Sequence, residues 1–242
     1  MIAHCRDFFA RNPQWWALLL SACAWITLPA IAHPAHEMSS MSGSEHVSHA
    51  LTPRWSDAFN WIAMTTAMML PLTASSVQTV AIRSLWNRRH RAIAFFLLAY
   101  VTCWVIAGLF LNAAFRATLH TAVSTIVLLP ITLGIAAVWE LTSLKELALR
   151  RCHRTEPLAP VGWRADWSCI RFGFRQGSAC IVSCWALMLV PLAIQHSLAS
   201  MAGVELIALT GRCRADRKPH MIAAGLLAGA MLAVLVKVRA QG

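Results

Sequence analysis

Long apolar stretches separated by polar segments dominate the chain. A helix needs about 20 mostly apolar residues to cross the hydrocarbon core of a bilayer. Seven stretches come near this length: residues 14–32, 58–82, 92–112, 121–140, 174–194, 197–211 and 221–238. The sixth is short, so we expect it to be tilted, re-entrant or extended by its flanks. The pattern predicts an all-α fold, a polytopic transmembrane helical bundle of about seven spans.

The first stretch has two interpretations. Its charged start, apolar centre and small residues at Ala30–Ala32 also resemble a secretory signal peptide with its cleavage site. Cleavage would leave six spans and make His33 the first residue. Both interpretations place residue 33 and those after it outside the cytoplasm.

Two connecting segments are long. Residues 33–54 are predicted to form an outside loop, and residues 141–173 a cytoplasmic one. Part of the second loop predicts an amphipathic helix along the membrane interface, because apolar residues share one helical face with basic residues opposite. These apolar residues are Leu141, Leu144, Leu147 and Ala148. We expect one integral membrane domain, residues 1–242, with no separate soluble domain.

Composition supports this interpretation. Hydrophobic residues make up 58% of the chain, charged residues only 13%, and the mean hydropathy is +0.57. The net charge of +11 is not spread evenly. With the N-terminus inside, seventeen of the 21 Lys and Arg residues fall on the cytoplasmic side. This positive-inside bias indicates membrane topology rather than a nucleic-acid partner.

Other features are interpreted as structural. The cysteines show no disulfide framework or zinc-type spacing, and Cys152 and Cys213 are expected beyond the bilayer on the reducing side. Gly225 and Gly229 form a small-xxx-small pattern that predicts close helix packing within the bundle. Glu140 is expected at the membrane interface.

Sulfur side chains are spaced four residues apart in two predicted spans. Cys180, Cys184 and Met188 share one helical face, as do Met64 and Met68, with Met69 adjacent. Thiol and thioether are soft ligands that select Cu(I). Counted from the outer helix ends, the two sets lie at matching depths, roughly 9 Å and 15 Å down. They would face each other if the helices touch; alternatively, these side chains only fill the core.

The predicted outside loop adds further potential ligands. It contains His33, His36, Met38, Met41, His46 and His49. Short His-rich tracts often bind metals, although a solvated linker would have the same composition. Near the outer end of the sixth stretch lie His196, Met201 and Glu205. A carboxyl group at that depth would serve as a ligand, a proton acceptor or a hydrogen-bond partner.

The sequences "WIAMTTAMMLP" and "GSACIVSCWALML" resemble the predicted metal-binding integral membrane proteins, a family long described as a domain of unknown function and similar to copper chaperones. Matching positions are Met64, Met68, Met69, Pro71, Cys180, Cys184, Trp185, Leu187 and Met188, and Met201 fits a later Met. The resemblance implies copper delivery to exported copper enzymes. The chain departs from the family pattern at Asn60, at Gln195-His196-Ser197 and at "GRCR", where the family has Met, a Gly/Met turn and a Glu-Lys pair.

These observations favour a membrane protein that handles Cu(I) at the outer face and passes it to an exported copper enzyme or an assembly partner. We expect it in the bacterial cytoplasmic membrane, with its N-terminus inside and in contact with the lipid bilayer. No covalent chemistry is required, so we do not expect an enzyme. The alternatives are a polytopic transporter of a metal or small solute and, less favoured, a haem or electron-transfer protein. The metal's identity, the recipient and the oligomeric state are left open.

Overall fold

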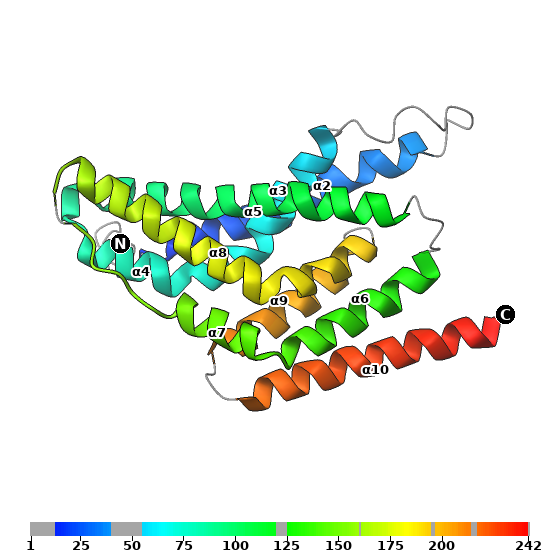
Figure 1. The fold of residues 1–242 in the computed structure, drawn as a ribbon. Coiled ribbons are helices and arrows are strands. Elements are labelled where there is room, and N and C mark those ends of the chain that lie inside the picture. Colours follow the sequence, from blue (N-terminus) through cyan, green and yellow to red (C-terminus); the bar gives the residue numbers. More distant parts are fainter. Residues whose placement is uncertain are drawn as a thin grey trace, which may run out of the picture. The chain divides into compact units, whose positions relative to one another are not determined.

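The computed structural model describes residues 13–39, 55–119, 125–159, 161–194, 197–213 and 217–241. Every secondary-structure element in these ranges is helical, which confirms the all-α prediction for them (Figure 1). The elements are α2 (Trp15–Ser39), α3 (Trp55–Met69), the 3-10 turn η1 (Pro71–Thr73), α4 (Ala74–Arg83), the 3-10 turn η2 (Trp86–Arg88), α5 (Arg89–Leu119), α6 (Thr125–Glu140), α7 (Ser143–Cys152), α8 (Trp163–Ala193), α9 (Leu198–Cys213) and α10 (Arg217–Gln241).

The described chain divides into two compact units. The first takes in the chain up to Leu109 together with Pro157–Gly173, and the second takes in Phe110–Glu156 and the chain from Phe174 onward. Helices α5 and α8 contribute to both units, because each contains one of the dividing points.

Two helices in the described ranges are long and apolar enough to cross a membrane, Trp86–Phe115 and Trp163–Ala193. A third candidate is the pair Leu128–Glu140 and Ser143–Cys152, which is bent by 69°. The helices Trp15–Leu28 and His220–Val234 are apolar but shorter. The all-helical class is therefore established for the described residues, and the count of seven spans stays a prediction.

Several predicted boundaries are wrong. The stretch 58–82 is not one helix but α3, η1 and α4, interrupted at Pro71. The connecting segment predicted at residues 141–173 is shorter than expected, because α8 already begins at Trp163. Helix α2 continues to Ser39, inside the segment 33–54 that was predicted to be a loop. Hydropathy marks the apolar part of a helix, whereas its ends depend on backbone hydrogen bonds that continue into polar sequence.

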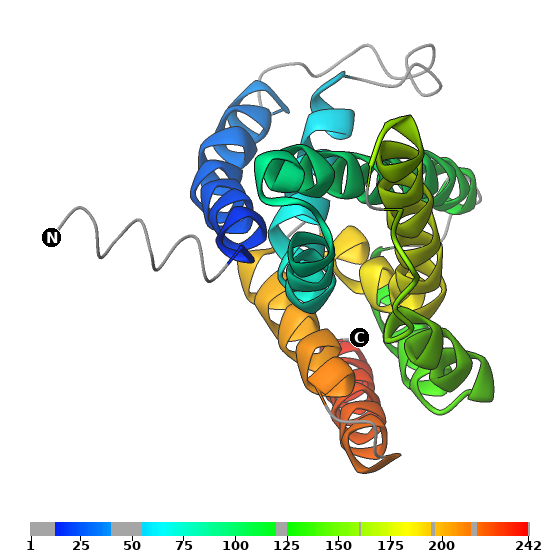
Figure 2. The same ribbon diagram turned by 90° about the vertical axis from the view of Figure 1, so that its left-hand side faces the viewer.

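In the first unit, α2 packs along α3, as Figure 2 shows for the blue and cyan ribbons. Helix α5 meets the first part of α8 closely, with the Phe96 and Phe172 rings 5.3 Å apart. A Cβ atom at Gly173 would lie only 2.5 Å from the Phe96 carbonyl oxygen, so the absence of a side chain permits this approach. Asp166 pairs with Arg88 and, at 2.7 Å, with Arg91.

In the second unit, α10 runs along α6 (Figure 1). Helix α6 is fixed to α8 by Trp139, whose indole Nε1 donates to the Val182 carbonyl oxygen at 3.1 Å. The Trp139 and Trp185 rings also meet edge to face at 5.0 Å. The close packing predicted for Gly225 and Gly229 is wrong, because a Cβ atom at either position would meet no described atom within 4 Å.

The predicted amphipathic helix exists as α7, with one difference. Leu144 and Leu147 are exposed, as an interfacial helix requires, but Lys145 is buried. Glu140 is also buried, and its carboxylate pairs with Lys145; its place at the membrane interface stays a prediction. The other carboxylate oxygen lies 3.1 Å from His220 Nδ1 on α10. The sequence did not indicate this burial, because the partners of Glu140, one five and one eighty residues away, are brought to it only by folding.

Candidate metal centre

In the first unit, three thioether side chains lie together in sequence at the end of α3. Met64, Met68 and Met69 are all 0% exposed. Met64 and Met68 are one helical turn apart, as the spacing predicted, because α3 is helical throughout this stretch. The first group of predicted soft ligands is therefore in the protein interior.

Pro71 explains how this turn is held. A proline has no N–H to donate to the carbonyl four residues earlier, so the Ala67 carbonyl lacks its helical partner. The Ser21 hydroxyl on α2 donates to that oxygen instead, at 2.6 Å. The Tyr100 hydroxyl on α5 donates to the neighbouring Met69 carbonyl at 3.2 Å. Two other helices thus fix the backbone that carries Met68 and Met69.

The side chain of Trp61 links α3 to α5. Trp61 lies on α3, one helical turn before Thr65. Its indole Nε1 donates to the Trp104 carbonyl oxygen at 2.9 Å. The ring fits because Gly108 has no side chain; a Cβ atom there would lie 1.8 Å from Trp61 Nε1. Trp61 follows Asn60 in the motif that carries the family resemblance, and here its role is to position the methionine-bearing helix.

In the second unit, the sulfur side chains lie on successive turns of α8. Cys180 and Met188 are 0% exposed and Cys184 is 5% exposed. Cys180 and Cys184 are one helical turn apart on α8, so their thiols are neighbours on one face of the helix. The Ser183 hydroxyl donates to the Cys180 carbonyl at 2.9 Å and lies 3.4 Å from the Cys184 sulfur. Two thiols with a polar neighbour are suited to a two-coordinate soft cation.

Cys152 is a third thiol that sequence reasoning placed elsewhere. Its expected position beyond the bilayer stays a prediction, but within the fold it lies against α8, where Gln176 Nε2 donates to the Cys152 carbonyl at 3.0 Å. The Cys152 thiol lies near the Ser183 hydroxyl and interacts electrostatically with Cys184. No pattern in the sequence predicts that Cys152 approaches Ser183 and Cys184, because α7 and α8 are joined by a segment of ordinary loop composition.

The Cys152 thiol is protonated at neutral pH. Burial raises its pKa from the ordinary value of 9.0 to about 11, and the nearby Arg212 only partly opposes this. Cys152 is the last residue of α7, at the very end of the bent pair Leu128–Glu140 and Ser143–Cys152 and outside the two helices that could each cross a membrane alone. A metal ion at this thiol would have to displace its proton.

The remaining predicted ligands have different outcomes. Met201 on α9 is 0% exposed, and Glu205 one turn later is half-buried and has an interaction partner. The backbone of His33, His36 and Met38 belongs to α2, but their side chains lie outside the described residues. The other candidates lie wholly outside the described residues: Met41, His46, His49 and His196.

Within the part of the chain that is described, no three side chains of His, Cys, Asp or Glu come together in a way that could hold a metal ion. The candidate donors there are therefore the thiols and thioethers. The methionines of α3 belong to the first unit and the cysteines of α8 to the second. Their facing each other stays a prediction.

A family model described as "PpoB2: Copper chaperone" matches residues 58–236. The chain belongs to the PpoB2 family of copper chaperones. The match covers about three quarters of the chain and includes both sulfur-bearing helices, α3 and α8. Neither a curated protein nor a solved structure matches the chain.

Membership in the PpoB2 family establishes copper handling and confirms the copper part of the resemblance drawn from the two motifs. It also agrees with the soft character of the buried donors. The family match does not identify the residues that hold copper.

Proposed function

We propose that this chain is a membrane-embedded copper chaperone that holds Cu(I) with thiol and thioether sulfur and delivers it on the outer side of the membrane. The recipient would be an exported copper enzyme or an assembly partner, and transfer would proceed by ligand exchange without covalent chemistry. The observation that carries the proposal is the burial of the Cys180 and Cys184 thiols on one face of α8, in a chain of a copper-chaperone family.

The chemistry of the donors supports the monovalent state. Sulfur ligands stabilise Cu(I) over harder cations, and a buried site excludes the water and oxygen ligands that Cu(II) prefers. Met188 lies one turn beyond Cys184, and Met201 on α9 is equally buried. A cation that moved along α8 would pass from two thiols to thioether, a weaker ligand from which release to a partner is easier.

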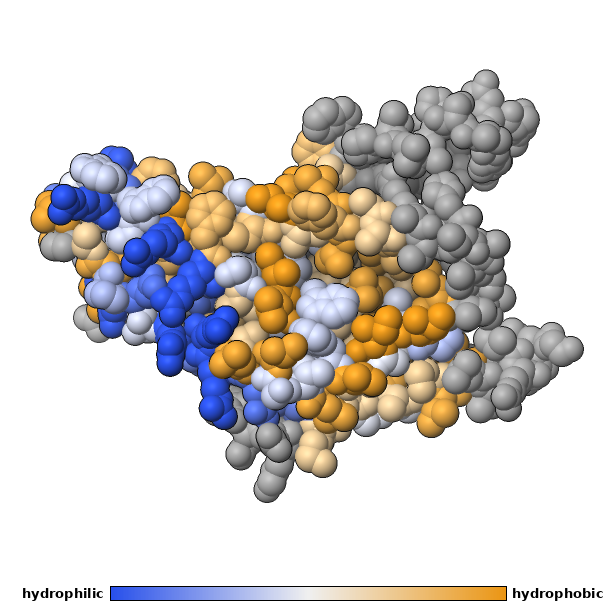
Figure 3. Space-filling view, viewed as in Figure 1, coloured by the Kyte–Doolittle hydropathy of each residue, from blue (hydrophilic) through white to orange (hydrophobic). Residues whose placement is uncertain are grey.

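Surface composition supports a location in the membrane. Leu98, Leu109 and Phe110 on α5 are exposed, which is unfavourable in water and favourable in lipid. In the second unit, Figure 3 shows hydrophobic side chains over α6 and hydrophilic ones over the C-terminal end of α7. The tryptophans Trp163 and Trp167 at the start of α8 are exposed, as is typical of residues at a membrane interface.

Copper stoichiometry tests the ligand assignment. Cys180→Ser with Cys184→Ser removes both thiols and should lower copper per detergent-purified chain to well below half of the wild-type value, measured by elemental analysis after growth with copper. The matched control, Cys103→Ser with Cys169→Ser, removes two thiols outside this group and should leave copper unchanged. Equal loss in both double variants, or no loss in the first, would refute the thiol site.

A second function, passage of copper across the membrane, is favoured by one observation. Cys152 approaches Ser183 and Cys184, so thiol ligands continue from α8 to the end of α7. Delivery at the outer face predicts no copper flux into proteoliposomes containing the purified protein. Measurable uptake that is lost in Cys152→Ser would favour transport instead.

A further inference from the structure

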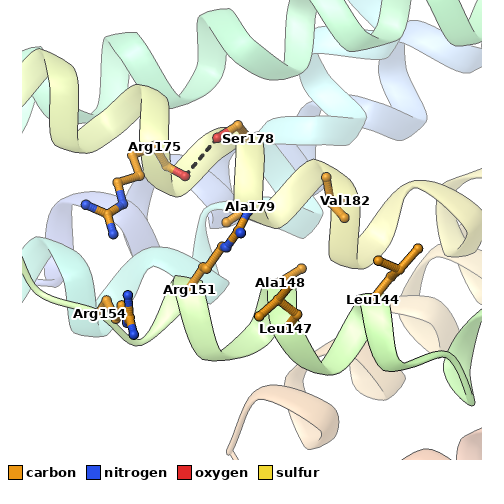
Figure 4. A pocket seen from close by; sticks show the side chains of 9 residues that line it. All are labelled: Leu144, Leu147, Ala148, Arg151, Arg154, Arg175, Ser178, Ala179 and Val182. Atoms are coloured by element: carbon orange, nitrogen blue, oxygen red, sulfur yellow. Dashed lines mark hydrogen bonds between the residues drawn. The ribbon is translucent and has the colours of Figure 1, made fainter.

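A groove of about 520 Å3 lies between α7 and α8 in the second unit. Figure 4 shows side chains from both helices lining it. None of the sulfur side chains belongs to it, so it is separate from the candidate metal centre.

The two ends of the groove differ in chemistry. Arg151, Arg154 and Arg175 lie at one end, and Leu144 and Leu147 extend away from them along α7 (Figure 4). On the α8 side the lining continues with small and apolar residues toward Val182. The leucines are 57% and 47% exposed, so the apolar wall is not covered by the described parts of the chain.

The charged end carries a net positive charge. Arg175 pairs with Glu156. Among the described residues, no other carboxylate pairs with an arginine that lines the groove. Arg151 and Arg154 have no carboxylate partner in the described part of the chain. Two guanidinium groups beside an exposed apolar wall fit a ligand that is anionic at one end and apolar along the rest.

We propose that this groove binds an anionic phospholipid, with its phosphate at Arg151 and Arg154 and an acyl chain along Leu144 and Leu147. A free phosphate would leave the apolar wall exposed, and an uncharged lipid would leave the arginines without an anion. The proposal rests on the membrane location proposed above. A bound lipid would hold α7 against α8, the contact that brings Cys152 to Ser183.

Native mass spectrometry of the detergent-solubilised full chain tests this proposal, with phosphatidylglycerol and phosphatidylcholine of equal chain length as probes. Wild type should retain phosphatidylglycerol preferentially. Arg151→Gln with Arg154→Gln should weaken that retention roughly tenfold or more, because each basic residue near a lipid headgroup contributes about 1 kcal/mol. The control Arg150→Gln with Arg164→Gln removes the same charge from exposed positions outside the groove and should bind as wild type does.

Further arms separate the alternatives. Arg151→Lys with Arg154→Lys keeps the charge and should retain most of the preference, and millimolar glycerol phosphate should not displace the lipid. Displacement by glycerol phosphate, equal binding of both lipids, or equal loss in the control would overturn the lipid site. Alkaline extraction of membranes is measured in parallel. A chain that stays in the membrane without lipid preference refutes the groove alone, whereas a chain that is extracted refutes the membrane proposal as well.

Discussion

At the residue scale, the buried charges around Glu140 are the most constrained feature of the second unit. Its side chain is 1% exposed and is held by Lys145 from α7 and by His220 from α10. Removing an ion from water costs several kcal/mol, and the cost is offset only while its partner is present. The network therefore links the consecutive helices α6 and α7 to α10, which is distant in the sequence.

We predict that Glu140→Gln lowers the free energy of unfolding by about 3 kcal/mol, because it leaves the Lys145 ammonium buried without its counter-charge. Denaturant unfolding in detergent measures the change. Adding Lys145→Met to Glu140→Gln should recover much of the loss, since no buried charge remains. Glu146→Gln, at a half-exposed position of α7, is the control and should change stability by less than about 0.5 kcal/mol. Equal effects at Glu140 and Glu146 would contradict the buried network.

Cys152 gives a prediction that depends on pH. With its pKa raised to about 11, the thiolate fraction at pH 8 is about 100-fold lower than in the unfolded chain. Iodoacetamide should therefore modify Cys152 about that much more slowly in the native protein than in denaturant, as measured by peptide mass mapping. Stability should be insensitive to this group below pH 9 and fall as the pH rises from 9 to 11, because the unfolded chain loses the proton first. Equal alkylation rates would show that the thiol is not buried.

At the scale of elements, the break at Pro71 decides how the methionine-bearing helix is held. The Ala67 carbonyl, deprived of its helical donor, depends on Ser21 from α2. A buried carbonyl without any donor costs about 1–3 kcal/mol. The contact between α2 and α3 is thus part of the candidate metal centre, although α2 supplies none of its described ligands.

We predict that Ser21→Ala destabilises the chain by about 1–3 kcal/mol and lowers copper retention, because the turn that carries Met68 and Met69 loses its anchor. The matched control, Ser75→Ala in α4, removes a hydroxyl at an exposed position. In a Pro71→Ala background the residue at 71 regains an N–H for the Ala67 carbonyl, so Ser21→Ala should cost less there. Thermal unfolding and elemental analysis of the four variants measure both effects, and an equal cost in both backgrounds would contradict the proposed compensation.

At the scale of the whole molecule, the distribution of Lys and Arg predicts which side of the membrane each segment occupies. Alkaline phosphatase fused after residue 54 should be active, and fused after residue 156 inactive. Fluorescent-protein fusions at the same positions should give the opposite pattern. A fusion after residue 242 should be active if there are seven spans. Inactive phosphatase at both 54 and 242 would contradict the predicted topology.

The pattern of apolar residues was sufficient for the helical class and for most helix centres, including α7 and α9. It also placed Cys180, Cys184 and Met188 on one face, because spacing along a single helix needs no tertiary information. It gave the wrong end for α8 and missed the interruption at Pro71. A mid-span proline is compatible with either a kink or a break, and the contacts of Ser21 and Tyr100 decide between them.

What the sequence alone determined is the local chemistry: helices, their sulfur-bearing faces, and the two motifs whose resemblance implied copper before the family match. The tertiary structure decided the burial of Glu140 and the approach of Cys152 to Ser183. Both depend on α7 folding back on its neighbours, and so on contacts between segments that no local pattern records. Desolvation and pairing act only once those segments meet, which is why the pKa of Cys152 and the charge network of Glu140 are properties of the fold.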